Sequence, residues 1–198
     1  MARLMHVYRA LKDSFKKDAA LERIAKEFDF PVIWPLFQVE RRGMVLDTAL
    51  LEKMGVELRG ELASIEEEMY DLVGYEFNAA SPVQLSQVLF TKLQLPTAGI
   101  KKGKTKYSTG QKELDKLRGQ HPIIELIERH RELSKLMSTY IEALPKLIDA
   151  QSRLHTTFNQ DVASTGRLSS TNPNLQNIPV RTTLGRKIRQ AFVPSKGK

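Results

Sequence analysis

The sequence predicts a mostly α-helical fold with a small α+β extension at its C-terminal end. Two long stretches, residues 47–74 and 122–144, place apolar side chains three and four positions apart, which is the spacing of amphipathic helices. From Arg153 onward the apolar residues alternate with polar ones, which is typical of strands. We therefore expect two long helices followed by the beginning of a sheet.

The N-terminal part of the chain shows helical spacing in three segments. Residues 3–28 predict two short helices. The first long helix begins at Asp47, and Gly74 is its expected C-cap. Five glutamates share its outer face: Glu57, Glu61, Glu66, Glu67 and Glu68. We interpret this face as solvated and expect it to point away from any nucleic acid.

Capping signals predict a shorter helix after the first long one. Ser81, Pro82 and Gln84 supply, in order, an N-cap, a first-turn proline and a capping-box glutamine. Residues 99–110 follow this helix and are rich in Gly and Lys without apolar periodicity. They predict a mobile, exposed loop.

The chain then returns to helical spacing. Ser108 or Thr109 is expected to cap a short helix through Leu114. The second long helix starts after Pro122, mostly with coiled-coil-like spacing, and we expect it to pair antiparallel with the first.

Residues 153–198 resemble the start of a sheet that is not finished. Leu154 and Phe158 alternate with polar neighbours, which predicts a strand. Residues 165–179 are dominated by Gly, Ser, Asn, Gln and Pro and predict a loop, and residues 188–193 predict a second short strand or extended segment. Because this tail lacks its sheet partners, we expect unpaired strand edges.

Nearly all of the excess positive charge lies in this tail. The formal net charge is +8, and residues 151–198 carry eight basic side chains and one acidic one. Such a concentration next to polar residues favours a polyanion as partner, because Lys and Arg that neutralise phosphates release condensed counterions. A basic tail can equally be only solvated, so charge alone leaves both interpretations open.

The composition excludes several other classes of protein. There is no cysteine, which excludes disulfides and thiolate metal sites, and the four histidines lack the spacing of a zinc site. The longest apolar run, Pro31 to Phe37, is far too short to cross a bilayer. We expect no membrane partner and a cytoplasmic, nucleoid-associated location.

Several sequence blocks occur in a specific order. The tail contains TGRLSS followed by NPNLQNIPVR, and upstream lie PLFQVERRGMVLD, FNAASPVQL, KYST and HRELSKLMSTYIEALPKLI. Together they resemble the family A DNA polymerases of the bacterial DNA polymerase I type over residues 31–198. The segment ARLMHVYRALKD is similar to the end of the last helix of that family's 3′-5′ exonuclease domain.

The resemblance implies a domain organisation and a partner. Residues 1–28 would be the end of an exonuclease-domain helix and a linker, residues 29–150 the thumb subdomain with its long antiparallel helices, and residues 151–198 the incomplete N-terminal segment of the palm with its first strands and loop. The implied partner is double-stranded primer–template DNA. In the family, the next strand carries DYSQIELR, whose first Asp binds the catalytic metals, and the sequence ends before it.

Catalytic residues are therefore not expected in this chain. Two-metal phosphoryl transfer needs carboxylates that converge on ions about 3.5 to 4 Å apart. The tail offers only Asp161, and a lone loop carboxylate is typical of a turn or a surface charge. We expect no cofactor in this chain, Mg²⁺ in the complete polymerase, and a complementary chain that carries palm and fingers. Whether the chain counts as an enzyme stays open.

A first set of candidate residues suits the minor groove, where every base pair presents N3 or O2 acceptors in nearly the same places. The resemblance implies contacts at the primer terminus from Arg167, Asn174, Gln176 and Asn177. It implies sugar or phosphate contacts from Ser169, Ser170 and Arg181. The alternative is that the Asn and Ser side chains only cap turns.

A second set suits the DNA backbone. The lysine-rich loop leads into a helix N-terminus, where unpaired N–H groups and the helix dipole favour a phosphate. By resemblance this is the thumb tip, and its residues are Lys101, Lys102, Lys104, Lys106, Ser108 and Thr109. On the second long helix, Arg131 and Lys135 share a face that could follow a backbone. The alternatives are a solvated lysine loop and an Arg131 that pairs with Glu128 or Glu132.

The remaining conspicuous residues are interpreted as structural. We expect His130 and His155 to be packed and hydrogen-bonded, and Tyr140 and Phe158 to lie in the core. Trp34 is expected to be buried in the turn that enters the first long helix, with stacking on a base as the alternative.

Three functional hypotheses follow. The leading one is the primer–template DNA-binding part of a family A DNA-directed DNA polymerase, which serves replication or repair synthesis and needs a separate palm and fingers portion for nucleotidyl transfer. The second is a stand-alone, non-catalytic module that binds DNA ends. The third is an inactive polymerase remnant.

Overall fold

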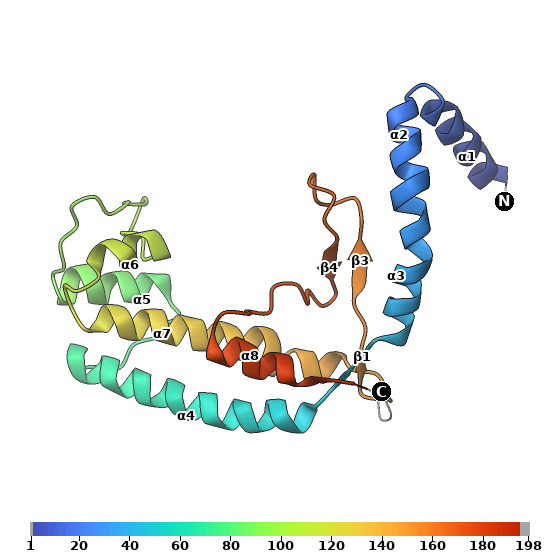
Figure 1. Cartoon of the computed structure of the whole chain (residues 1–198). Helices are drawn as coiled ribbons and strands as arrows, with labels where there is room; N and C mark the ends of the chain where they lie inside the picture. The colour runs from blue at the N-terminus through green and yellow to red at the C-terminus, as the bar shows by residue number, and fades with distance from the viewer. Residues whose placement is uncertain (1, 195–198) are drawn as a thin grey trace. The chain divides into compact units, whose positions relative to one another are not determined.

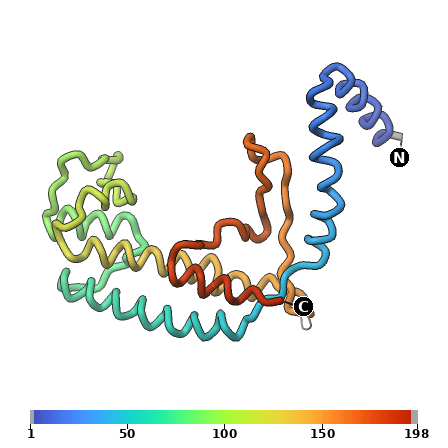
Figure 2. Tube along the Cα trace, viewed as in Figure 1, coloured from blue at the N-terminus to red at the C-terminus, as the bar shows by residue number. Residues whose placement is uncertain are grey.

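The computed structural model describes residues 2–194 (Figures 1 and 2). Its helices are α1 (Ala2–Phe15), α2 (Ala19–Ile24), α3 (Phe30–Arg42), α4 (Thr48–Val73), α5 (Pro82–Gln87), α6 (Gln111–Leu117), α7 (Ile123–Leu136) and α8 (Thr183–Gln190). Its strands are β1 (Met44–Leu46), β2 (Arg153–Leu154), β3 (Thr157–Asn159), β4 (Ser169–Thr171) and β5 (Phe192–Val193). The predicted class, mostly helical with a small antiparallel β component, is confirmed.

The chain forms two compact units, and each combines segments that are distant in the sequence. The first unit takes in the chain up to Leu46, residues 147–182 and the chain from Phe192 onward. The second unit takes in residues 47–146 and 183–191. No helix in the described part of the chain combines the length and the apolar character that crossing a membrane requires.

The second unit is built on the two predicted long helices, α4 and α7, which contact each other and run in opposite directions (Figure 1). The Asp47 side chain caps α4 by accepting a hydrogen bond from the Leu50 backbone N–H at 3.0 Å. Gly74 ends α4 in the left-handed conformation, with a φ of 85°. The helices bury their apolar stripes; Leu51 on α4 and Leu133 on α7 are both 0 % exposed. π-helical turns at Val88–Lys92 and Met137–Ile141 extend α5 and α7.

The acidic face of α4 is only partly solvated, which corrects the sequence-based interpretation. Glu61 accepts two hydrogen bonds from the Arg129 guanidinium of α7, at 2.9 and 2.7 Å. Glu66 lies 3.0 Å from Nε2 of His130, whose side chain is buried as predicted. These glutamates therefore bridge α4 to α7, because their spacing places them beside the partner helix.

The first unit contains a three-stranded antiparallel sheet in the order β2-β1-β5. Val45 in β1 pairs with Arg153 on one side and with Val193 on the other. A separate hairpin joins β3 to β4. The expectation that the tail lacks sheet partners is therefore wrong: β1 precedes the long helices in sequence and pairs with the tail strands β2 and β5, and β3 pairs with β4.

Four local predictions also need correction. Of the segment 188–193, predicted as a second short strand or extended segment, residues 188–190 end helix α8, and Phe192–Val193 form the strand β5. The predicted loop 165–179 contains strand β4. Trp34 is 65 % exposed in this chain and stacks on Phe37 within α3, with ring centroids 5.4 Å apart. Tyr140 is buried as predicted, whereas Phe158 is only half-buried.

Candidate nucleic-acid interface

The β3–β4 hairpin positions the candidate residues of the first unit. Thr157 pairs with Thr171, and Asn159 pairs with Ser169. The Thr156 hydroxyl fixes the base of the hairpin, because its Oγ1 lies 2.7 Å from Ser170 Oγ and 2.8 Å from the Pro173 carbonyl oxygen. The segment that closes the hairpin is therefore held on a hydrogen-bonded support.

The four predicted minor-groove residues, Arg167, Asn174, Gln176 and Asn177, are all exposed; Arg167 lies before β4 and the other three follow it. The Gln176 side-chain amide donates to the Leu168 carbonyl at 2.9 Å, and Asn174 Oδ1 accepts from the Gln176 backbone N–H at 3.0 Å. These two amides thus also order the turn, as the alternative interpretation expects. Arg167 precedes β4 and presents its guanidinium to solvent.

The two serines of β4 were predicted to contact a sugar or phosphate, but both hydroxyl groups are buried. Ser170 is 0 % exposed, and its hydroxyl accepts from the Leu175 backbone N–H at 3.1 Å. Its role is to hold the hairpin, and it does not fit a contact with a sugar or phosphate. The Ser169 hydroxyl is buried and has no hydrogen-bond partner among the described residues. Arg181, at the end of this segment, is exposed.

In the second unit, the lysine-rich loop has a defined turn. Gly103 N–H donates to the Lys106 carbonyl, and Ser108 N–H donates to the Lys101 carbonyl, each at 2.8 Å. Lys102 forms an antiparallel bridge to Tyr107, and its Nζ lies 5.3 Å from the centre of the Tyr107 ring. The loop is thus a small hairpin whose amide and carbonyl groups pair with each other.

The lysine side chains line a cationic concavity. Lys101, Lys102 and Lys104 are exposed, and Lys106 is half-buried. Lys101, Lys106, Ser108, Thr109 and Arg131 are among the residues that line a hollow of about 500 Å³ at this loop. Since a concave cationic surface concentrates positive potential, the hollow suits an anion.

The expected capping of α6 by Ser108 or Thr109 is wrong. Gly110 is the N-cap, and no side chain caps this helix. Ser108 Oγ accepts from the Gly110 N–H at 3.3 Å and lies 3.3 Å from Glu113 Oε2, to which it donates. Thr109 is 5 % exposed, so its hydroxyl is turned to the protein interior.

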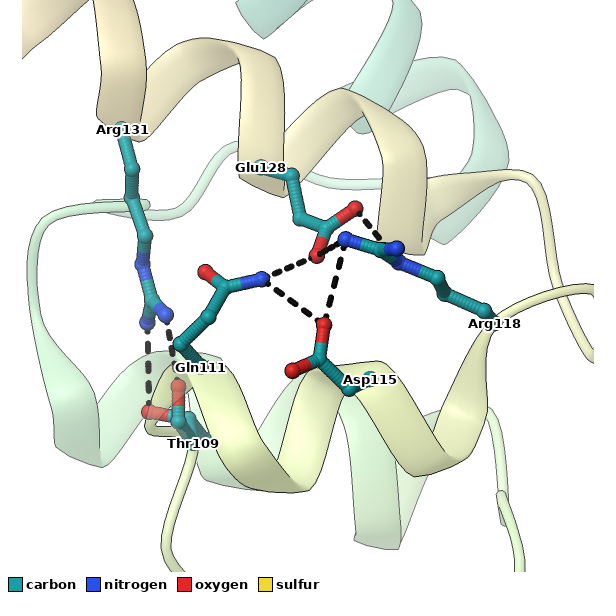
Figure 3. Close-up of polar contacts among 6 residues, drawn as sticks. All are labelled: Thr109, Gln111, Asp115, Arg118, Glu128 and Arg131. Atoms are coloured by element: carbon teal, nitrogen blue, oxygen red, sulfur yellow. Dashed lines mark hydrogen bonds and ion pairs between the residues drawn. The ribbon is translucent and has the colours of Figure 1, made fainter.

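Arg131 holds Thr109 in that position. Its Nη1 donates to the Thr109 carbonyl at 2.6 Å, and its Nη2 donates to Thr109 Oγ1 at 3.3 Å (Figure 3). Burial lowers the pKa of the Arg131 guanidinium. Neither sequence-based alternative described this contact, since Arg131 pairs with Thr109 and not with Glu128 or Glu132.

Glu128 belongs to a separate polar cluster that joins α6 to α7 (Figure 3). Arg118 Nη2 lies 2.8 Å from Glu128 and 3.1 Å from Asp115, and the Gln111 amide donates to both carboxylates. The hydrogen bond from Arg118 lowers the pKa of the Glu128 carboxyl. The cluster fixes the start of α6 and hence the end of the lysine-rich hairpin.

Lys135 lies one turn beyond Arg131 and is exposed. The Ser138 hydroxyl next to it donates to the Ser134 carbonyl at 2.9 Å. Lys135 is therefore the residue of the predicted α7 stripe whose charge points freely to solvent, whereas Arg131 is engaged in packing.

Sequence reasoning missed the basic residues of α8. Arg186, Lys187 and Arg189 are exposed, while Gly185 and Ile188 are buried on the other side of the helix. The signal that could have identified this helix is the spacing of four between Leu184 and Ile188.

The donor side chains of the described residues decide whether the chain can hold a metal ion. Within residues 2–194, no group of three or more His, Cys, Asp or Glu side chains is arranged to hold a metal ion. Asp161 is exposed in the loop that follows β3. The described side chains do not fit a two-metal centre.

A comparison with known protein families agrees with the order of the sequence blocks, the paired long helices and the β3–β4 hairpin. The family model described as DNA polymerase family A matches residues 48–198. The chain therefore belongs to DNA polymerase family A.

Individual relatives are DNA polymerases I. The chain is 51 % identical over 175 residues to that of Geobacillus stearothermophilus, a match covering 88 % of this chain and 20 % of the relative. It is 49 % identical over 177 residues to that of Synechocystis sp., covering 89 % and 18 %, and 44 % identical over 192 residues to the thermostable enzyme of Thermus thermophilus, covering 96 % and 23 %. The chain thus spans about a fifth of the length of these curated relatives.

A solved structure agrees with the fold. It is described as the POL domain of Pol1 from M. smegmatis in complex with DNA primer-template and dNTP. The TM-score is 0.86 at 37 % identity, and the match covers 98 % of this chain and 34 % of that one.

Proposed function

We propose that this chain is the primer–template DNA-binding part of a family A DNA-directed DNA polymerase. The observation that carries the proposal is the structural match over nearly the whole chain to a polymerase domain described in complex with DNA primer-template. The exposed Arg167 and the cationic hollow of the lysine-rich hairpin supply suitable chemistry within the two units. Residues 29–150 would act as the thumb, residues 151–198 as the first palm segment, and residues 1–28 as the link to an exonuclease domain.

Two kinds of contact support this role. In the first unit, Arg167 and the amides of Asn174, Gln176 and Asn177 can donate to minor-groove acceptors without reading sequence. In the second unit, the loop lysines and Lys135 can neutralise phosphates. Binding should therefore show little sequence preference and a strong dependence on salt.

Nucleotidyl transfer would need a complementary palm and fingers portion. That portion would supply the carboxylates that hold Mg²⁺, because the described residues of this chain form no such cluster. DNA binding would also associate the protein with the nucleoid.

The first test measures binding of the purified chain to a labelled primed duplex at low salt, with a blunt duplex of the same length as comparison. We expect tighter binding of the primed duplex, and Arg167→Ala should remove that preference. Arg9→Ala is the matched control, since it removes the same charge from an exposed position on α1. Equal behaviour of the two variants would contradict the assignment of Arg167.

The second test addresses the partner. The chain is mixed with a polypeptide that carries a family A palm and fingers, and primer extension is measured. Extension that requires both polypeptides supports the proposal. Binding of DNA ends without extension in any mixture would favour the stand-alone module, and the absence of both activities would favour an inactive remnant.

A further inference from the structure

Helix α8 has a charged side for which residues 2–194 provide no counter-ion. Arg186, Lys187 and Arg189 are exposed, and the segment from Thr183 to Pro194 contains no acidic residue. The only polar contact of these three cations with the described residues joins Arg186 Nη2 to the Thr183 hydroxyl, at the long distance of 3.5 Å. The charges are therefore available to an external partner.

The arginines around α7 show the contrast. Arg129 is paired with Glu61 and Glu132, and Arg118 with Glu128 and Asp115. In the second unit, to which α8 also belongs, Arg118 and Arg129 are thus neutralised by carboxylates of the same unit. The α8 cations lack such partners among the described residues, which distinguishes them from an ordinary mixed-charge helix face.

The opposite side of α8 fixes the helix in place. Ile188 and Ala191 are both 0 % exposed. The Asp47 N–H donates to the Ala191 carbonyl at 2.7 Å, which ties the end of α8 to the residue that caps α4. Cations on a packed helix lose less conformational freedom on binding than cations on a free tail, so this arrangement favours a specific contact.

The spacing of the cations suits one kind of partner. Three charges between residues 186 and 189 lie along about 4.5 Å of helix axis, or roughly one charge per 1.5 Å. Double-stranded DNA carries about one negative charge per 1.7 Å of its axis with both strands counted, and about one per 3.4 Å on each strand. The α8 cations are therefore dense enough to neutralise successive phosphates of a nucleic-acid backbone, and arginine and lysine are both suited to phosphate oxygens.

We propose that the exposed face of α8, formed by Arg186, Lys187 and Arg189, is a phosphate-binding surface for duplex DNA. The proposal rests on the proposed DNA-binding function and adds to it a contact element that sequence reasoning did not identify. Its role differs from that of Arg167: α8 contributes affinity for any duplex, whereas Arg167 contributes the preference for a primed end.

The experiment compares the salt dependence of duplex binding for three forms of the whole chain. The α8 variant is R186Q/K187Q/R189Q, in which glutamine keeps a high helix propensity. The control R3Q/R9Q/K17Q removes three charges from exposed positions of the N-terminal region, so the change in net charge is the same. Binding to blunt and primed duplexes is measured between 50 and 200 mM salt.

We expect the slope of log K against log salt to fall by about 3 in the α8 variant and to stay unchanged in the control, because each neutralised phosphate contributes about 0.9. The ratio of wild-type to variant affinity then shrinks about 40-fold across this salt range, equally for both duplexes. An α8 variant with the wild-type slope would overturn the proposal. If the triple variant loses its helical circular dichroism, the single variant Lys187→Gln decides, with an expected slope change of about 1.

Different results would refute the role of α8 and the proposed function. A wild-type slope in the α8 variant, together with a selective loss of primed-end binding in Arg167→Ala, would refute the role of α8 and leave the proposed function intact. No salt-dependent duplex binding by the wild-type chain would refute both.

Discussion

A methyl group added at Gly43 would test the junction between α3 and β1. Gly43 has a φ of 61° and a ψ of −179°, a region that is open essentially only to glycine. A Cβ at this position would lie 2.8 Å from His155 Cε1 and 2.9 Å from the Leu154 carbonyl oxygen. The carbonyl belongs to the paired strand β2, so it cannot move aside without disturbing the sheet.

Two contributions lower the stability of the Gly43→Ala variant. The backbone conformation costs about 1 to 3 kcal/mol for a residue with a side chain. Overpacking against fixed atoms costs about 1 to 3 kcal/mol more. With roughly 2 to 4 °C of melting temperature per kcal/mol for a chain of this size, we expect a decrease of about 10 °C in the transition that involves the first unit.

Two other glycines separate these contributions. Gly166 also has a positive φ, of 73°, but a Cβ there would meet nothing within 4 Å, so Gly166→Ala should show the smaller, conformational loss alone. A Cβ at Gly60, inside α4, likewise meets nothing within 4 Å, and Gly60→Ala should stabilise by about 0.5 to 1 kcal/mol. Differential scanning calorimetry measures all three variants. A Gly43→Ala chain that melts with the wild type would refute the packing described for this junction.

Three further outcomes are expected. Ile188→Ala, at a site that is 0 % exposed, should destabilise by about 2 to 5 kcal/mol in urea unfolding; a change below 1 kcal/mol would mean that α8 is not packed as described. The hydrogen bonds from His155 to the Glu40 carbonyl and to Asp149 raise the pKa of His155. The stabilisation that His155 contributes is therefore fully present below the unfolded pKa of about 6.5 and disappears as pH rises through the folded pKa. In urea titrations, the free energies of unfolding of His155→Gln and wild type should converge with rising pH, and a difference that is constant with pH would contradict this sign. Arg131→Met should accelerate amide exchange in the lysine-rich hairpin and destabilise by about 1 to 3 kcal/mol, since it leaves the buried Thr109 groups unpaired; unchanged exchange would show that Arg131 does not hold the hairpin.

The long helices could be predicted because their signals are local. Asp47 and Gly74 mark both ends of α4, and the structure uses each as predicted. Ser81 likewise caps α5, with its Oγ 3.4 Å from the Gln84 N–H. The capping-box glutamine departs from the pattern, because Gln84 Oε1 accepts from the Asn78 N–H at 2.7 Å. The type of element was thus readable from residues a few positions apart, whereas the partner of a polar side chain was not.

Helix α8 could not be predicted because its local signal is weak. Eight residues with one threonine and one glycine have little intrinsic helix stability, since isolated helices of this length are marginal in water. The burial of Gly185 and Ile188, which a sequence does not display, decides the conformation. The same reason explains β4: its pairing of Ser169 with Asn159 joins a segment of turn-forming residues to a distant strand.

Part of the candidate site could likewise be predicted from the sequence, and part could not. The exposure of Arg167 and of the loop lysines followed from residue type and the sequence blocks. The inward position of Thr109 and Ser170 did not, because a hydroxyl is as compatible with a hydrogen bond inside the protein as with one to a phosphate. Only the contacts with Arg131 and with Thr156 distinguish these possibilities.

Strand β1 shows how an earlier segment of the chain can supply the sheet partner that the tail lacks in its own sequence. Its three residues pair with β2 on one edge and β5 on the other, and Leu46 N–H donates to the Ser152 carbonyl at 2.9 Å. The tail strands β2 and β5 therefore both pair with one central strand. β1 leads directly into α4 and β5 closely follows α8, so the sheet pairs segments that flank these two helices in the sequence.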